Sequence, residues 1–183
     1  MRDIFSLKIE TPRLLLRPQR REDFEPWAAM MADPEGTRFI NGPHPRAAAW
    51  RGFMTVAGCW ALQGFSLFSV IEKSSGRWIG RLGPWMPEGW PGPEVGWALV
   101  REAWNRGYAT EGAAAAIDWA FEHLGWGEII HVIAPDNLAS QALAAKLGSR
   151  KRGPGRLPPP SQDARVDIWG QTRAEWIARR PRR

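Results

Sequence analysis

The chain has 183 residues, of which 44% are hydrophobic and 24% charged, and this suits one globular domain with its own core. Its formal charge of +6 favours a polyanionic partner such as a nucleic acid, a membrane surface or a phosphorylated cofactor. The single cysteine, Cys59, excludes an internal disulfide, and no stretch is apolar enough for a membrane span or a secretory signal. We therefore expect a soluble, cytoplasmic protein.

Strand-like and helix-like segments alternate along the chain. An apolar run closed by a proline predicts the first strand, and apolar residues at helical spacing predict the helix after it. The strands expected in chain order lie at 13–18, 65–72, 78–85, 94–100, 128–134, 150–157 and 164–170. The expected helices lie at 22–31, 47–62, 107–124, 137–147 and 171–180.

This order contains no internal repeat and no linker long enough to separate two domains. It predicts one mixed sheet covered by helices, which is an α/β architecture. The strand, helix and strand within 94–134 should form a right-handed parallel crossover.

The most informative stretch is VREAWNRGYATEG, where a strand ends, a short loop turns and an alanine-rich helix begins. Gly107 and Ala109 are small, so a ligand can approach the backbone at the helix start. The first amides of a helix have no partner within it, and the helix dipole adds positive potential, so a pyrophosphate fits there. Arg101, Arg106 and Thr110 add positive charge and a hydroxyl donor. A plain strand-to-helix turn has the same spacing, and neither a P-loop nor a G-x-G-x-x-G motif is present.

Residues 94–112, EVGWALVREAWNRGYATEG, resemble the strand, loop and helix of GNAT acetyltransferases, in particular of the RimJ/RimL-type group. The segments ETPRLLLRP, GRWIGRLGPW and WAFEHLG followed by PDNLASQALAAKLG agree with this resemblance. It covers a core of about 11–176 within a single domain, 1–183, and leaves 177–183 as a basic tail.

The resemblance implies an α/β (α+β) fold. Its sheet would be mixed, mostly antiparallel and seven-stranded, with about four helices flanking it. The sheet would be splayed between the strands at 94–100 and 128–134.

The resemblance also implies acetyl-CoA as co-substrate. Residues 104–109 would form the pyrophosphate loop, although Trp104 stands where the family has Gln or Arg. Pantetheine would pair with Leu99 and Val100 like an added strand, and an amide near Leu99 would stabilise the tetrahedral oxyanion. Asn137 would bond the pantetheine arm; alternatively it is a simple N-cap. The residues expected to bind the cofactor are Leu99, Val100, Asn105, Arg106, Gly107, Tyr108, Ala109, Thr110, Asn137 and Ser140.

Two residues are candidates for catalysis. Ser140 would protonate the departing thiolate, or it only bonds local backbone in the first turn of a helix. Glu94 would accept the amine proton through a water, or it is an ordinary exposed carboxylate at a strand end. Ser149 departs from the family, which has an aromatic or apolar residue there.

Other polar and aromatic groups have simpler readings. His131 alternates with Ile129 and Ile133, which indicates a hydrogen-bonded core histidine. No grouping of His, Cys, Asp and Glu has metal-ligand spacing. Several tryptophans, Trp85, Trp90 and Trp97, surround a Pro/Gly loop and either wall an amine pocket or pack in the core.

Three functions remain in view. The first is direct acetyl transfer, in a ternary complex, to a primary amine of a protein N-terminus or a small molecule; a homodimer is compatible with it. The second is an acyl-CoA-binding module without turnover that acts through a partner. The third, a nucleic-acid binder, is disfavoured because aromatic residues are not interleaved with the basic runs. Those runs are Arg150, Lys151, Arg152 and Arg156, and the tail Arg179, Arg180, Arg182 and Arg183.

Overall fold

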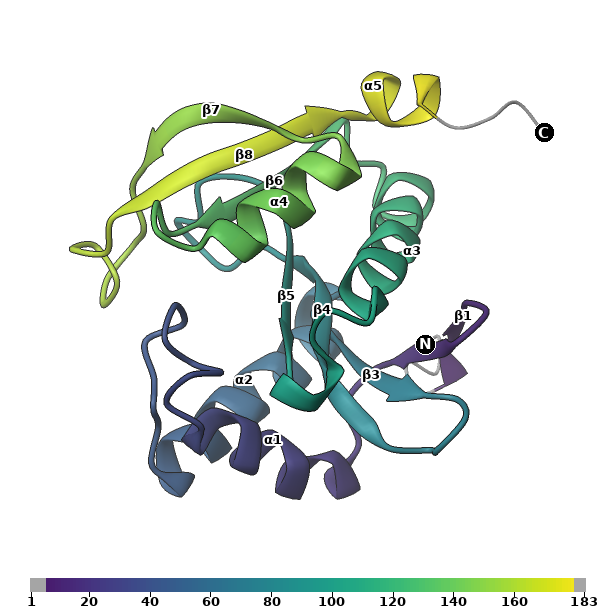
Figure 1. Cartoon of the computed structure of the whole chain (residues 1–183), viewed down its shortest axis with the longest axis vertical. Helices are drawn as coiled ribbons and strands as arrows, with labels where there is room; N and C mark the ends of the chain where they lie inside the picture. The colour runs from purple at the N-terminus through teal and green to yellow at the C-terminus, as the bar shows by residue number, and fades with distance from the viewer. Residues whose placement is uncertain (1–5, 180–183) are drawn as a thin grey trace.

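The computed structural model describes residues 6–179, which form one eight-stranded sheet with helices packed against it (Figure 1). The strands are β1 (Ile9–Glu10), β2 (Leu14–Arg17), β3 (Phe68–Glu72), β4 (Trp78–Trp85), β5 (Glu94–Leu99), β6 (Glu128–Ile133), β7 (Arg150–Gly155) and β8 (Val166–Thr172). Their order in the sheet is β1-β2-β3-β4-β5-β6-β8-β7. Every neighbouring pair is antiparallel except β5 and β6. The mixed, mostly antiparallel sheet is confirmed, and so is the parallel crossover.

The predicted count of seven strands was one too low. The additional strand, β1, has two residues and pairs with β2 through Ile9 and Glu10. Two residues are too few for an alternating pattern, so no periodicity in the sequence marks them.

Five α-helices cover the sheet, one more than the resemblance implied. They are α1 (Phe24–Ala32), α2 (Arg46–Gln63), α3 (Tyr108–His123), α4 (Leu138–Leu147) and α5 (Arg173–Ala178). Consecutive strand residues point to opposite faces. On β4, Leu82 meets Gly112 of α3, whereas Arg81 lies over the ring of Trp27 in α1. Helices α3 and α1 therefore cover opposite faces.

The sheet opens between β5 and β6, as predicted. Each strand has six residues, yet they share only the pair Glu94 and Ile130. In Figure 1, β4 and β5 run down the middle of the molecule while β6 and β8 lie above them. Beyond this pair, no other strand within residues 6–179 bonds either facing edge.

Some residues of the predicted basic clusters are held in ion pairs. Lys151 pairs with Asp167 at 2.7 Å and Arg152 with Glu128 at 2.5 Å. Residues 180–183 of the tail lie outside the described residues. None of the described helices is both long and apolar enough to cross a bilayer. Within 6–179, no group of three or more His, Cys, Asp and Glu residues has a geometry that could hold a metal ion.

Candidate active site

Helix α3, which follows the open strand β5, begins with backbone amides that lack a partner among the described residues. Gly107 is its N-cap and has φ 78°, a left-handed conformation that favours glycine. Asn105 also has a positive φ, 57°. No acceptor within the described part of the chain hydrogen-bonds the amides of Gly107, Tyr108 or Ala109. The first carbonyl bond of the helix runs from the Glu111 amide to Gly107, at 3.1 Å. The loop therefore offers donors to a ligand rather than to itself.

The side chains around these amides are engaged in building the loop. Tyr108 is buried, and its hydroxyl donates to Glu72. Arg106 lies over the Tyr108 ring and pairs with Glu72 at 3.3 Å. Arg101 pairs with Asp33 at 2.7 Å. The two guanidiniums expected to add positive charge near the phosphate site thus each have a carboxylate partner, which offsets part of that charge.

A residue far upstream in the chain also supports the loop. Arg13 donates to Glu111 at 2.6 Å and to the Arg106 carbonyl at 2.9 Å, and lies over the Tyr108 ring at 4.5 Å. Its Nη2 would be 3.3 Å from a Cβ at position 107. Sequence reasoning missed this residue, because nothing local marks a contact that spans more than ninety residues.

The open edge of β5 presents the backbone of alternate residues. The Val100 amide donates to Ile79 of the β4 side at 3.0 Å, and its carbonyl accepts from Ala103 at 3.0 Å. By the alternation of an antiparallel ladder, Trp97 and Leu99 turn their amides the other way, toward β6. The predicted backbone pairing of a ligand with Val100 must therefore be revised. Leu99 keeps an amide on the open edge, with no partner from residues 6–179.

Trp104, the departure from the family pattern, has a structural role. Its indole donates to the Leu99 carbonyl at 2.8 Å. This bond ties the loop to the end of β5 and occupies the carbonyl, while the Leu99 amide stays available.

The carboxylate of Glu94 lies at the point where the strands part. Its Oε1 accepts from the Val132 amide at 3.1 Å, where a parallel neighbour would supply a carbonyl. Its Oε2 accepts from the Trp90 indole at 2.7 Å. The residue is only 7% exposed, so the reading of Glu94 as an exposed carboxylate is wrong.

Burial also changes the acidity of this group. It raises the Glu94 pKa to about 7, although the two hydrogen bonds and the charge of Arg81 act in the opposite direction. At neutral pH both the protonated and the ionised form of this carboxyl group are therefore populated.

Ser140 and Asn137 sit together at the start of α4. The Asn137 carbonyl oxygen accepts from the Ser140 amide at 3.1 Å, so Asn137 is the N-cap. The Ser140 hydroxyl accepts from the indole of Trp97 at 3.2 Å, which leaves its proton free to be donated elsewhere. This bond links α4 with β5 across the splayed strands.

His131 is a buried structural histidine, as predicted. Its Nδ1 donates to the Val95 carbonyl at 2.7 Å, since a carbonyl only accepts, and its Nε2 faces the Ser149 hydroxyl at 2.9 Å. Burial lowers its pKa to about 4, so the ring is neutral and Nε2 accepts the Ser149 proton. The unusual Ser149 is thus part of a bonded network, together with Gln171 at 3.1 Å.

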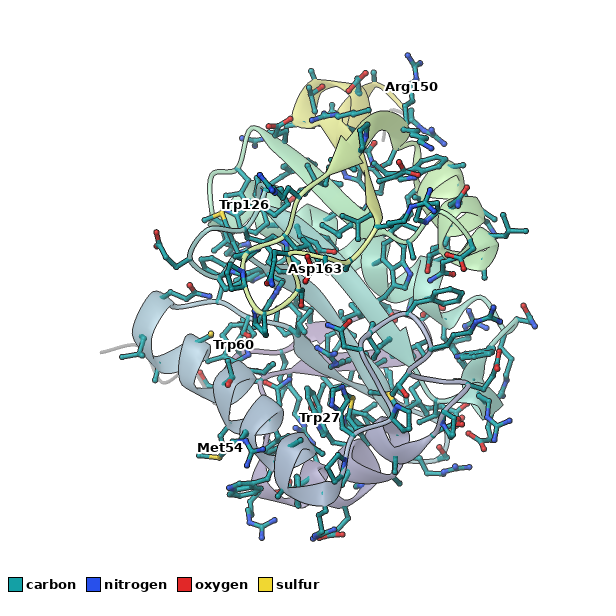
Figure 2. All side chains as sticks on the ribbon, turned by 90° about the vertical axis from the view of Figure 1, so that its left-hand side faces the viewer. Trp27, Met54, Trp60, Trp126, Arg150 and Asp163 are labelled. Carbon is teal, nitrogen blue, oxygen red and sulfur yellow. The ribbon has the colours of Figure 1, made fainter. Side chains whose placement is uncertain are left out.

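A cavity of about 560 Å³ joins these groups. It reaches from Asn137 and Ser140 past Glu94 to the loops that precede α2 and β8. The two loops approach each other on the left of Figure 1, and the Asn41 amide donates to the Ser161 hydroxyl there at 3.1 Å. In Figure 2 the loop before β8, labelled at Asp163, lies in front of the middle of the sheet. The cavity is therefore bounded by segments far apart in the sequence.

Comparison with known proteins identifies the family of this chain. Residues 13–150 match the acetyltransferase (GNAT) domain family. The chain belongs to the GNAT family. It is 31% identical over 146 residues to the uncharacterized N-acetyltransferase p20 of Bacillus licheniformis, covering 78% of this chain and 82% of that protein. A GNAT protein of this kind is an acyltransferase.

Solved GNAT structures share the fold. An acetyltransferase from Agrobacterium tumefaciens is 29% identical and superposes with a TM-score of 0.79, over 91% of this chain and 95% of that one. Mycobacterium smegmatis RimJ in complex with CoA-disulfide has a TM-score of 0.69 at 19% identity, over 88% of this chain and 83% of that one. At 19% identity, the similarity to RimJ shows only that the two proteins share a fold. The GNAT fold uses acetyl-CoA, so the open amides of α3 and the parted strands are the features to test against that co-substrate.

Proposed function

We propose that this GNAT protein transfers an acetyl group from acetyl-CoA to a primary amine by direct attack in a ternary complex. The main support is the combination of three features: the unpartnered amides at the start of α3, the open edge of β5, and a cavity lined by both Ser140 and Glu94.

The residues present fit acetyl-CoA. The amides of Gly107, Tyr108 and Ala109 would hold the diphosphate, with Asn105, Arg106 and Thr110 around it. The Leu99 amide would bond the pantetheine or the thioester carbonyl. Asn137 can cap α4 through its carbonyl oxygen and still offer its NH2 to the pantetheine arm, while Val100 would contribute only side-chain contact.

The chain supplies both proton transfers. A protonated amine must lose a proton before it attacks, and a base with a pKa near neutrality suits that step. Glu94 would accept this proton, directly or through a water, and its two hydrogen bonds orient the carboxylate. The Ser140 hydroxyl, oriented by Trp97, would donate to the departing sulfur. Acetyl-CoA supplies the activated thioester.

Calorimetric titration with acetyl-CoA, followed by measurement of free thiol with a panel of amines, tests the proposal. We expect binding and amine-dependent thiol release. Absence of binding at about 1 mM acetyl-CoA, the weak end of ordinary KM values, would overturn it. Binding without thiol release with any amine would instead indicate an acyl-CoA-binding module.

A further inference from the structure

Three arginines line the cavity without an ion-pair partner. Arg38 comes from the loop between α1 and α2, Arg81 from β4, and Arg165 from the loop between β7 and β8. Within the described residues, no carboxylate lies within 4 Å of any of these guanidiniums. By contrast, Arg13, Arg17, Arg46, Arg101, Arg106 and Arg152 all have such partners. Other described arginines, such as Arg51 and Arg77, also lack an ion-pair partner, but they do not line the cavity, whereas these three do.

Arg81 is the most informative of the three. Its guanidinium lies 4.8 Å from the centre of the Trp27 ring, and its buried Nε has no hydrogen-bond partner in 6–179. Burial lowers its pKa to about 10, so it remains charged at neutral pH. Glu94 attracts it electrostatically, but both Glu94 oxygens are bonded to other groups. Arg81 as a whole is half-buried. A partly desolvated cation without an ionic partner is less stable than a paired one, and an anion from a ligand would offset that cost.

The sheet register places this cation on the same face as the proposed base, four residues along the strand. Arg81 pairs with Ala98 in the sheet, and Glu94 is an even number of residues from Ala98 on β5. Since strand side chains alternate, Arg81 and Glu94 lie on the same face. A ligand that places its amine at Glu94 can therefore present an anionic group to Arg81.

Part of the cavity wall is apolar. Trp85 and Trp90 pack edge to face with their ring centres 6.5 Å apart, and Phe39 and Leu157 line the same cavity. Such walls suit an apolar side chain between the two charged ends.

We infer that the acceptor is a small amphoteric amine. Its amine meets Glu94, its anionic group, a carboxylate or phosphate, is held by Arg81 with help from Arg38 and Arg165, and its apolar part packs on Trp85 and Trp90. Apolar amino acids have this chemistry. The inference rests on the proposed acetyl transfer and narrows its acceptor.

Two sets of matched acceptors test whether the anionic group matters, with thiol release from acetyl-CoA as the measurement. The carboxylate arm compares L-phenylalanine with phenethylamine and L-phenylalaninamide, and the phosphate arm compares O-phosphoethanolamine with ethanolamine. In one of the two arms, we expect kcat/KM for the anionic acceptor to be at least 10-fold higher than for its uncharged counterparts. The amide has the more acidic ammonium, so its free-amine fraction works against this result. Equal or better use of the uncharged members in both arms overturns the inference.

Variants test the assigned cation. Arg81→Gln should remove the preference by raising KM for the anionic acceptor. Because the Arg81 charge lowers the Glu94 pKa, the anionic and uncharged acceptors are compared at a pH well above 7, where Glu94 is deprotonated in both proteins. Arg81→Lys should retain part of it. Arg165 is exposed, so Arg165→Gln tests the site without risk to the core and should lower the preference by about 3-fold. Arg51→Gln, on the exposed surface of α2, is the matched control and should change nothing. A preference that survives both Arg81→Gln and Arg165→Gln overturns the assignment.

Failure of this inference is distinguishable from failure of the proposed function. If acetyl-CoA binds and an uncharged amine is acetylated as well as its anionic counterpart, the transferase stands and the acceptor class is wrong. If acetyl-CoA does not bind, both are wrong.

Discussion

The two sides of the splayed strands are built differently. On the α3 side, the proposed cofactor groups are mostly backbone amides and come from two segments, residues 99–110 and the start of α4. On the α1 side, the proposed acceptor groups are side chains from β4, from β5 and from the loops before α2 and β8. A backbone site tolerates side-chain changes such as Trp104, whereas a side-chain site changes its ligand with each substitution. We therefore expect the cofactor side to be common to the family and the acceptor side to determine the substrate.

Glu94→Gln should give the largest effect and separate the two sides. Removing a general base typically lowers the rate by about 10²–10⁴-fold, and we expect a fall of that order in kcat/KM. The acetyl-CoA Kd should be unchanged. In the unmodified protein, kcat/KM should rise with pH through about 7, as the buried carboxyl group loses its proton; the variant should lose this limb. Activity within about 3-fold of the original would exclude Glu94 as the base.

The same variant makes a prediction about stability. Burial raises the Glu94 pKa from 4.5 to about 7, so the folded state favours the protonated form. Its contribution to the free energy of unfolding is present below pH 4.5 and is lost as pH rises through 7. Glu94→Gln lacks this dependence. As the pH rises from 5 to 8, the thermal midpoint of Glu94→Gln should therefore increase relative to that of the unmodified protein.

Ser140→Ala should come next, with kcat about 100-fold lower if the hydroxyl protonates the leaving thiolate. The Kd for acetyl-CoA should change little. Trp97→Phe, which removes the donor to Ser140, should lower kcat by less. An unchanged kcat in Ser140→Ala would mean that the hydroxyl serves only the helix start.

The difference between the two sides also explains what sequence could predict. The role of Gly107 follows from the local spacing of residues 100–112, whereas the splay and the role of Asn137 follow from the family resemblance of residues 94–112 and 135–148. The burial of Glu94 follows from neither, because it depends on Val132 and Trp90, which reach it only once the strands have diverged. The ion pairs of Arg101 and Arg106 need Asp33 and Glu72, which the sequence places far from them. The same holds for the three unpaired arginines of the cavity, whose meeting depends on the tertiary fold.

Gly107→Ala tests the cofactor side by itself. The left-handed conformation costs an alanine about 1–2 kcal/mol, and the new Cβ would lie 3.3 Å from Arg13 Nη2. We expect the acetyl-CoA Kd to rise about 10-fold, equivalent to about 1.4 kcal/mol. Gly64→Ala is a matched control, since Gly64 has φ 81° at the end of α2 and open space around it. It should lose similar stability but keep its affinity. Equal affinity losses in both variants would show a general effect of destabilisation.

Ser161→Ala should give the smallest effect, and only on the acceptor side. It removes the acceptor of the Asn41 amide, one neutral hydrogen bond between two loops that border the cavity. Such a bond contributes about 0.5–1.5 kcal/mol, so the acceptor KM should rise about 3-fold while kcat and the acetyl-CoA Kd remain unchanged. Gln162→Ala, in the same loop, removes a side chain that bonds only its neighbour Asp163 and should leave KM unaltered. An altered acetyl-CoA Kd in Ser161→Ala would show that the two loops contribute to binding both substrates. The cofactor and acceptor sites would then not be independent where these loops border the cavity.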